Sequence, residues 1–225
     1  MAHPYYHSLS SVQRWGGTPD DFAPVHQWLD ASKQFIGHFR HRALRHHAEG
    51  AALAARIFGP SLDLGDARVV SVEDIASLHI QEDLGFIPSL SEWFHGIEVR
   101  LVSPRDDLFA TDQSLASVEK WGGEIADYLP IHDFIDQDFG LGSLQDNRLV
   151  RHHSEGIFLA ESVFGSVITN RDQRVVPTRV IAELHVNMEM GRIPSVSEIL
   201  TGIKVQSWMM KVAKPSRAIL SELSR

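Results

Sequence analysis

The sequence of 225 residues contains no cysteine. This absence excludes disulfide bonds, thiolate metal sites, iron–sulfur clusters and cysteine nucleophiles. Long hydrophobic runs are missing too: no apolar stretch approaches the roughly 20 residues that cross a bilayer, and we expect no signal peptide. Positive charge is the scarcer sign, with 21 Lys and Arg against 29 Asp and Glu and a net charge of −8, so nucleic acid is not an expected partner. We therefore expect a cytoplasmic protein that does not contact the membrane.

Histidine, by contrast, is abundant. The 13 histidines are about twice the number expected for this length. The rest of the composition, with 43% hydrophobic and 22% charged residues, is typical of a globular protein. The placement of the histidines therefore carries most of the functional information.

Three motifs of the first half return in the second half at one constant spacing. SLSSVQRWGG returns as SLASVEKWGG, RHHAEG as RHHSEG, and GFIPSLSEWFHGI as GRIPSVSEILTGI, each 106 residues later, as from Ser8 to Ser114. Repeats this long and this few predict two homologous units about a pseudo-twofold axis, the covalent equivalent of a homodimer. The predicted parts are a first repeat unit (1–97), a linker (98–113), a second repeat unit (114–203) and a C-terminal tail (204–225).

Local patterns predict that each unit is mostly helical. Thr18 followed by Pro19 and two aspartates is typical of a helix start, and further helices are expected at 42–58, at 148–164 and at 71–84. The capping boxes SLSE and SVSE open a final short helix in each copy, and VIT-NRDQ-RVV indicates a small hairpin. The predicted fold class is mainly α with a minor β-hairpin per unit.

Histidines and acids recur in both units at the spacing of metal ligands. On one expected helix His46 and Glu49 are three residues apart and share a face, and on the next His79 and Asp83 are four apart. Imidazole and carboxylate groups from two helices can together bind a divalent ion such as Zn, Mn or Fe, which is the predicted cofactor. The predicted metal ligands are His46, His79, Asp83, His152, His185 and Glu189.

Arginines beside the His-His pairs favour a phosphate-bearing substrate. Guanidinium groups suit bidentate contact with phosphate, and a metal that generates hydroxide next to them is typical of phosphoester hydrolysis. The predicted catalytic residues are Glu49, Glu155, His47 and His153, and the predicted substrate-binding residues are Arg45, Arg151, His26 and His132. A structural interpretation stays open, in which the histidines are satisfied core groups and the arginines pair with nearby acids.

The leading functional hypothesis is a metal-dependent hydrolase acting on a phosphate-containing small molecule or nucleotide. The alternative is a non-catalytic ligand- or protein-binding module, such as a sensor, a phage–host interaction protein or a nucleotide-sequestering protein. A third hypothesis is a non-haem metal redox enzyme, which the same ligands allow. We expect a pseudo-dimer within one chain, either monomeric or part of a higher homo-oligomer.

The motifs MAHPYYHSLSSVQRWGG, FRHRALRHHAEG, RVV and HIQEDLGFIPS resemble a small family of bacterial and phage proteins that carry a domain of unknown function. The resemblance covers nearly all of both units. It implies that most members have one such unit and dimerise, and that this chain fuses the pair. It implies no established activity.

Overall fold

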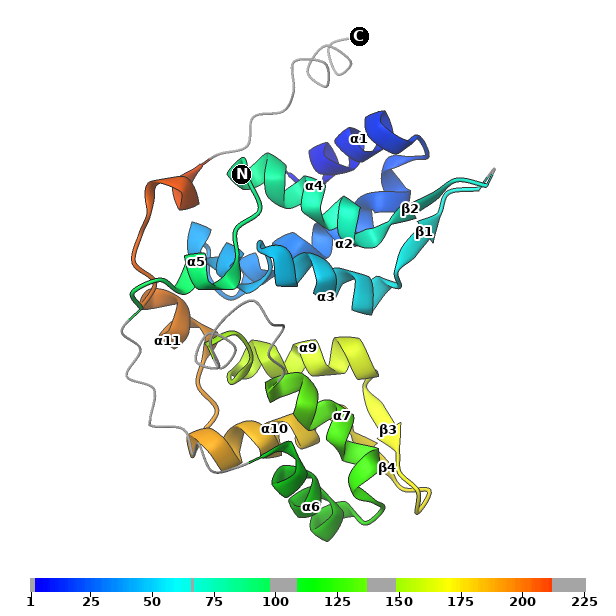
Figure 1. Ribbon diagram of the computed structural model, residues 1–225, viewed down its shortest axis with the longest axis vertical. Coiled ribbons are helices and arrows are strands. Elements are labelled where there is room, and N and C mark those ends of the chain that lie inside the picture. Colours follow the sequence, from blue (N-terminus) through cyan, green and yellow to red (C-terminus); the bar gives the residue numbers. More distant parts are fainter. Residues whose placement is uncertain (1–2, 66, 98–108, 137–148, 212–225) are drawn as a thin grey trace. The chain divides into compact units, whose positions relative to one another are not determined.

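The computed structural model describes residues 3–65, 67–97, 109–136 and 149–211, which form helices and two small hairpins (Figure 1). The expected fold class, mainly α with one hairpin in each of two homologous units, is confirmed. Contacts within the chain group residues 1–93 with residues 204–225 as one unit, and residues 94–203 as the other. Most of the predicted linker and of the predicted tail lies outside the described residues.

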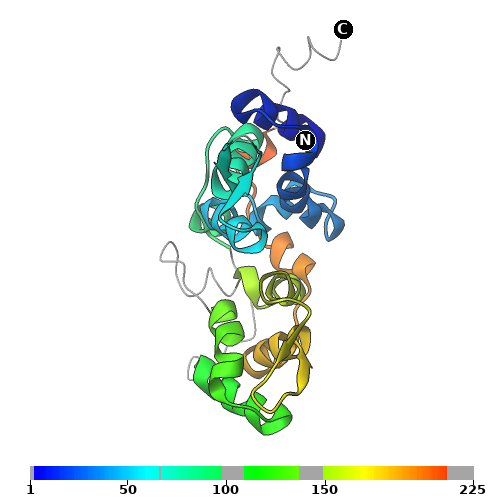
Figure 2. The same ribbon diagram turned by 90° about the vertical axis from the view of Figure 1, so that its right-hand side faces the viewer.

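The first unit is built on three α-helices that pack side by side, α2, α3 and α4 (Figures 1 and 2). Short 3-10 helices and a two-stranded antiparallel hairpin connect them. Its elements are α1 (Pro4–Trp15), α2 (Pro19–Ala31), η1 (Ser32–Gln34), η2 (Phe39–Leu44), α3 (Ala48–Phe58), β1 (Ser61–Asp63), β2 (Val69–Ser71), α4 (Val72–Leu84), α5 (Leu90–Phe94) and η3 (Ser207–Met210).

The second unit repeats this order within the described residues. Its hairpin is the predicted one, with Val167 opposite Pro177 and Thr169 opposite Val175. Its elements are α6 (Ala110–Trp121), α7 (Ile125–Asp136), α9 (Ser154–Phe164), β3 (Val167–Thr169), β4 (Val175–Pro177), α10 (Thr178–Met190) and α11 (Val196–Thr201).

The helix starts follow the predicted signals. Pro19 is the first residue of α2, and the Thr18 backbone N–H and hydroxyl both donate to Asp21, so the start is closed by a capping box. The Ser71 hydroxyl caps α4, which ends at Gly85 with φ +84°, a conformation that costs glycine little. These signals set the first and last residues of α4, and therefore which of its polar side chains face the core.

The helix predicted over 42–58 is wrong at its start. It is divided into η2 and α3 by a bend at residues 45–47, because His47 is extended (φ −154°, ψ 170°) and its Nδ1 caps α3 by accepting from the Gly50 N–H. The bend brings the Arg45 carbonyl oxygen close to residue 50. Only glycine fits there, because a Cβ would collide with that oxygen. His46 therefore lies outside the helix, and it does not share a helical face with Glu49.

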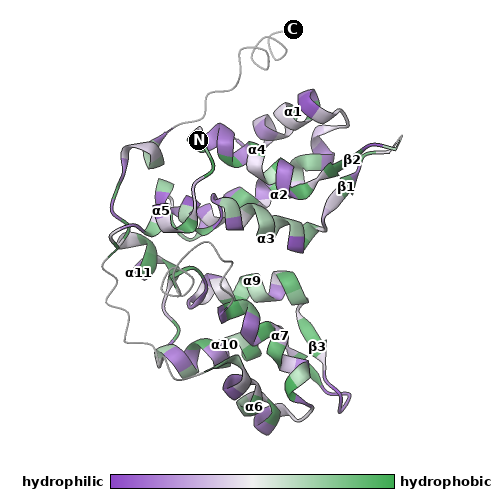
Figure 3. Cartoon of the chain, in the orientation of Figure 1, coloured by the Kyte–Doolittle hydropathy of each residue, from purple (hydrophilic) through white to green (hydrophobic). Residues whose placement is uncertain are grey.

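Apolar and polar residues alternate along the helices (Figure 3), but the interior of each unit is not purely apolar. Phe22, Leu29 and Ile75 are fully buried, and so are His46 and His79 in the same unit. Buried polar groups require partners, because burying one without a partner costs about 1–3 kcal/mol. Among the described residues, no helix has the length and apolar character needed to span a membrane.

Candidate metal centres

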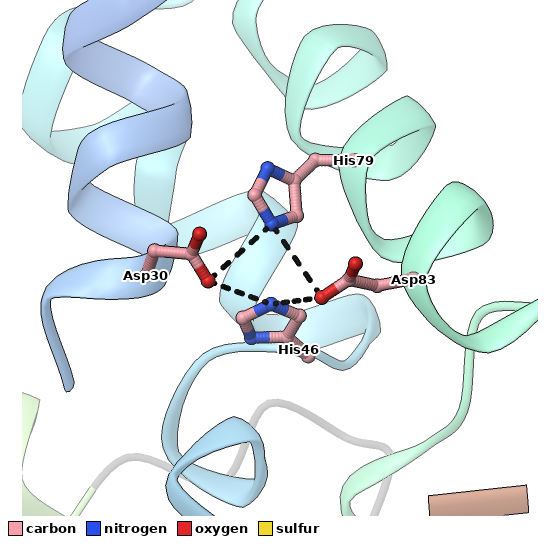
Figure 4. A group of neighbouring side chains, drawn as sticks. All are labelled: Asp30, His46, His79 and Asp83. Atoms are coloured by element: carbon pink, nitrogen blue, oxygen red, sulfur yellow. Dashed lines mark ion pairs between the residues drawn. The ribbon is translucent and has the colours of Figure 1, made fainter. Parts of the chain in front are cut away.

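Four polar side chains converge in the interior of the first unit, and we call them the first centre: Asp30, His46, His79 and Asp83 (Figure 4). Asp30 lies near the end of α2, His46 lies in the bend before α3, and the other two lie one turn apart on α4. The Nε2 atom of His46 lies 3.8 Å from Asp30 Oδ1 and 3.5 Å from Asp83 Oδ2. The Nε2 atom of His79 lies 3.9 and 4.0 Å from the same two oxygens. One ion can therefore contact all four groups.

The two imidazoles of the first centre are neutral bases. Burial lowers the pKa of His46, although Asp83 beside it acts in the opposite direction, and burial lowers the pKa of His79 well below 6.5. Within the described part of the chain, neither Nε2 atom has a hydrogen-bond partner. Both rings are fully buried, so solvent does not replace the missing hydrogen-bond partner.

Each carboxylate of the first centre also contacts a cation, through the same oxygen that faces the histidine nitrogens. Arg42 Nη2 donates to Asp83 Oδ2 at 2.6 Å, and Lys33 Nζ lies 2.7 Å from Asp30 Oδ1. Burial raises the pKa of Asp83, but the neighbouring His46 and His7 rings, each 3.5 Å from a carboxylate oxygen, hold that pKa well below the usual range. The first centre therefore combines two carboxylates with two neutral imidazoles.

The second unit has the matching cluster, and we call it the second centre: Asp136, His152, His185 and Glu189. The Nε2 atom of His152 lies 3.0 Å from Glu189 Oε2 and 3.6 Å from Asp136 Oδ1. The Nε2 atom of His185 lies 3.2 Å from Asp136 Oδ1 and 3.5 Å from Glu189 Oε1. The two Nε2 atoms are 3.2 Å apart.

These separations match the space around a transition-metal ion. Ligand atoms about 2.0–2.2 Å from a tetrahedral ion are about 3.3–3.6 Å from one another. In the second centre the histidine nitrogens lie 3.0–3.6 Å from each other and from the nearer carboxylate oxygens, which is close to this spacing, and one ligand atom from each residue lies within 4.8 Å of the others. The first centre, at 3.5–4.0 Å, is slightly wider. Contraction by a few tenths of an ångström would bring it to the same geometry.

A chain of hydrogen bonds sets the tautomer of His185. Ser117 Oγ donates to the Gln113 carbonyl at 3.0 Å, so it must accept from His132 Nε2 at 2.9 Å. Burial lowers the pKa of His132 to about 3, so this ring is neutral and its Nδ1 accepts from His185 Nδ1 at 3.2 Å. The Nε2 atom of His185 is then unprotonated, and its lone pair points toward the carboxylates.

The same sequence of groups is present in the first unit. His26 Nε2 lies 2.9 Å from Ser11 Oγ, and its Nδ1 lies 3.1 Å from His79 Nδ1. Burial lowers the pKa of His26 to about 3. A metal-binding histidine commonly donates its second ring N–H to such an outer partner, which fixes the ring orientation. His26 and His132, which the sequence predicted to bind substrate, lie in this supporting position.

The residue that contacts the helical acid of each centre, Asp83 on α4 or Glu189 on α10, differs between the units. In the first, His7 lies 3.5 Å from Asp83 Oδ1 and 2.6 Å from Glu82, and its ring stacks on His79 at 3.9 Å. Burial lowers the His7 pKa, but the adjacent carboxylates of Asp83 and Glu82 outweigh this effect and raise it to about 9. In the second, Gln113 occupies the equivalent position and donates to Glu189 at 2.8 Å. The first centre thus has a cationic neighbour where the second has an amide.

The other predicted site residues are not members of either cluster. His47 caps α3 and lies 3.0 Å from Glu49 Oε2. His153 caps α9 by accepting from the Glu155 N–H, and burial lowers its pKa to about 3. Their local contacts are those of helix starts.

The two predicted phosphate-binding arginines are buried against aromatic rings. The Arg45 guanidinium lies 4.5 Å from the Trp28 ring centroid and donates to the Trp28 carbonyl. Arg151 makes the same pair of contacts with Phe134, at 4.4 Å. Both arginines fasten the bend before the next helix to α2 or α7, which is a packing role.

Sequence reasoning missed one candidate ligand in each centre, Asp30 and Asp136. Each lies four residues after a repeated histidine, and the two aspartates are separated by the same 106 residues as the motifs. Applying the repeat spacing to every acid, instead of only to those beside the expected ligand helices, would have found them.

The comparison with known proteins gives one finding. A family model described as Domain of unknown function (DUF6915) matches the chain twice, at residues 2–102 and at residues 110–209. The two matches agree with the tandem duplication. No curated protein and no solved structure matches the chain.

Proposed function

We propose that this chain, which belongs to the DUF6915 family of domains of unknown function and carries two copies of the domain, is a metal-binding protein that holds one divalent transition-metal ion in each unit. The ligands would be the two histidines and two carboxylates of each centre.

One observation carries the proposal. In the first centre the Nε2 atoms of two buried, neutral imidazoles, both without hydrogen-bond partners, face two carboxylates at 3.5–4.0 Å. Burying polar groups without partners is costly. A divalent cation between them would give each group a bonding partner, and the ion together with the two carboxylates would have no net charge. The conserved local geometry of the two units supports the same ligand set twice.

The ligand types indicate the class of metal. Two imidazoles with two carboxylates suit Zn²⁺, Fe²⁺ or Mn²⁺, whereas Mg²⁺ and Ca²⁺ prefer oxygen ligands throughout. A centre with four protein ligands is typical of a structural ion, since catalytic zinc sites usually keep one position for water or substrate. We therefore propose that the ions stabilise the two helical units.

Hydrolysis of a phosphate-containing small molecule at the second centre is a second candidate function. It is favoured by one difference: the Asp136 side chain is 25% exposed, whereas that of Asp30 is 5% exposed. An ion bound there would supply a water of lowered pKa, and Asp136 would be the ligand on the solvent side. Phosphomonoester hydrolysis that follows metal occupancy of the second centre, and is lost in Asp136→Asn, would support it.

Elemental analysis of the purified full-length chain tests metal binding. We expect two ions per wild-type chain, and one ion per chain in His79→Gln and in His185→Gln, since each substitution removes one ligand nitrogen but keeps a polar side chain of similar reach. His38→Ala and His95→Ala are the matched controls, because both histidines are exposed and belong to neither centre. Both controls should retain two ions.

Cobalt provides an independent measurement. Co²⁺ in a four-coordinate nitrogen–oxygen site absorbs strongly in the visible range, so titration with Co²⁺ should give bands that reach their maximum at two equivalents. A wild-type chain that binds none of Zn²⁺, Mn²⁺, Fe²⁺ or Co²⁺ after purification and reloading would refute the proposed function. Equal metal content in all five proteins would also refute it.

A further inference from the structure

We propose that residues 204–211, which we call the docking segment, control the metal affinity of the first centre through Arg42 and Trp93. The proposal rests on the proposed function and adds a regulation of one of its two sites. The docking segment follows the second repeat in the sequence, but it packs within the first unit.

Aromatic and polar contacts hold the docking segment in place. The Trp208 ring lies edge-on to Trp93, with centroids 4.7 Å apart, and 5.3 Å from Phe86. Gln206 donates to the Glu92 carbonyl at 3.0 Å. The segment thus binds α5 and the turn after α4, the elements that lie next to the metal ligands on α4.

A buried arginine connects the docking segment to the first centre. Arg42 is 1% exposed; its Nη1 donates to the Lys211 carbonyl at 2.9 Å and its Nη2 donates to Asp83 Oδ2 at 2.6 Å. One guanidinium group therefore bridges a backbone carbonyl of the segment and a proposed metal ligand.

A second connection reaches the other side of the centre. The Trp93 indole N–H donates to the His46 carbonyl at 2.8 Å. Because Trp208 packs on the Trp93 ring, the docking segment also supports the bend that positions the His46 imidazole. Two of the four ligands of the first centre thus depend on groups that the segment contacts.

The direction of the coupling follows from the buried charge of Arg42. A guanidinium that loses the Lys211 carbonyl keeps its bond to Asp83, and its freed donors can turn toward the same carboxylate. Those oxygens are then less available to an ion, and the bend at His46 is less firmly held. Loss of outer-shell support of this kind typically costs 10–100-fold in metal affinity. Linkage is reciprocal, so a bound ion strengthens docking of the segment by the same factor.

The experiment measures zinc affinity by chelator competition on the full chain, one centre at a time. A His185→Gln background reports the first centre, and a His79→Gln background reports the second. We expect Trp208→Ala to weaken Zn²⁺ binding at the first centre about tenfold and to leave the second unchanged. Met210→Ala is the matched control, since Met210 lies in the same segment but is 54% exposed, and it should change neither affinity.

Hydrogen exchange checks the reciprocal effect. Zn²⁺ should slow amide exchange in residues 204–211 of the wild-type chain, and it should not do so in His79→Gln. If Trp208→Ala unfolds the unit, Trp208→Phe and Gln206→Ala replace it. Both should weaken Zn²⁺ binding at the first centre, but by less than tenfold.

Two negative results are distinguishable. The coupling is refuted if a folded Trp208→Ala chain binds Zn²⁺ at the first centre with wild-type affinity. It is also refuted if Zn²⁺ does not change amide exchange in the docking segment while both centres bind the ion. Absence of Zn²⁺ from both centres of the wild-type chain overturns the proposed function itself and the coupling with it.

Discussion

Asp30→Asn should have an effect on stability that depends on metal. Without metal, the substitution removes the repulsion between the Asp30 and Asp83 oxygens, which lie within 4.8 Å of each other. At an effective dielectric constant of about 20, two charges 4.8 Å apart repel each other by about 3.5 kcal/mol, and by more at a shorter distance. Arg42, at 2.6 Å from Asp83, cancels most of it. The lost contact with Lys33, whose side chain is 30% exposed, is worth about 0.2–1 kcal/mol. The two effects oppose each other, so we expect a change of less than about 1 kcal/mol.

With metal, the same substitution should be costly. An ion that binds only the folded state stabilises it by about 2.7 kcal/mol at a free concentration 100 times its Kd. Asp30→Asn removes a ligand and should lose most of this gain. The assay is urea unfolding followed by far-UV circular dichroism in the His185→Gln background, with chelator or with Zn²⁺.

Asp20→Asn is the control for this prediction. Asp20 lies exposed in the first turn of the same helix, where its charge favours the helix by about 0.3–1 kcal/mol with or without Zn²⁺. If Zn²⁺ stabilises the wild-type and the Asp30→Asn chains equally, Asp30 is not a ligand. A buried ion-pair network without metal would show the same cost in both conditions.

Three further results are expected. Ser117→Ala should weaken Zn²⁺ binding at the second centre by about tenfold or more, because His132 loses the acceptor that sets its tautomer, and Ser117→Thr should restore binding; equal affinity in chelator competition would contradict the hydrogen-bond chain. His47→Ala should lower the free energy of unfolding by about 1 kcal/mol, as for a lost helix cap, and the chain should still hold two ions by elemental analysis; a lost ion would make His47 a ligand. In chelator, stability should decline as pH falls from 6.5 toward 3, because burial lowers the pKa of His26 and of His132 to about 3, so the unfolded chain takes up protons that the folded chain does not. The slope from each histidine is at most about 1.4 kcal/mol per pH unit, and urea midpoints that stay constant from pH 6.5 to 4.5 would contradict it.

The repeat spacing in the sequence made much of the two centres predictable. All six histidines and acids predicted as ligands belong to the clusters in the structure, because His79 and Asp83 lie one turn apart on a single helix and their counterparts repeat that spacing. Local periodicity is reliable within one helix, since it depends only on the pitch of the backbone.

The errors come from features that local periodicity does not contain. The bend before α3 depends on His47 leaving the helical conformation to cap the next helix, and on Gly50 allowing the Arg45 carbonyl to approach. The local pattern shows neither feature, and it therefore favours a continuous helix through these residues. Asp30 joins the centre only because α2 packs against α4. The burial of Arg45 and Arg151 against Trp28 and Phe134 also follows from tertiary packing, which a local pattern does not contain.

The bond between Arg42 and Lys211 joins residues 169 positions apart, and this distance has a consequence during synthesis. The ribosome releases the first unit's helices early, but the residues that complete it emerge only after the whole second repeat. At about 5–20 residues per second this interval is roughly 10 s. During that time Arg42 lacks the Lys211 carbonyl and the Trp93 ring lacks the cover of Trp208. The first unit is therefore synthesised first, but it receives its last segment only after the second unit has been made.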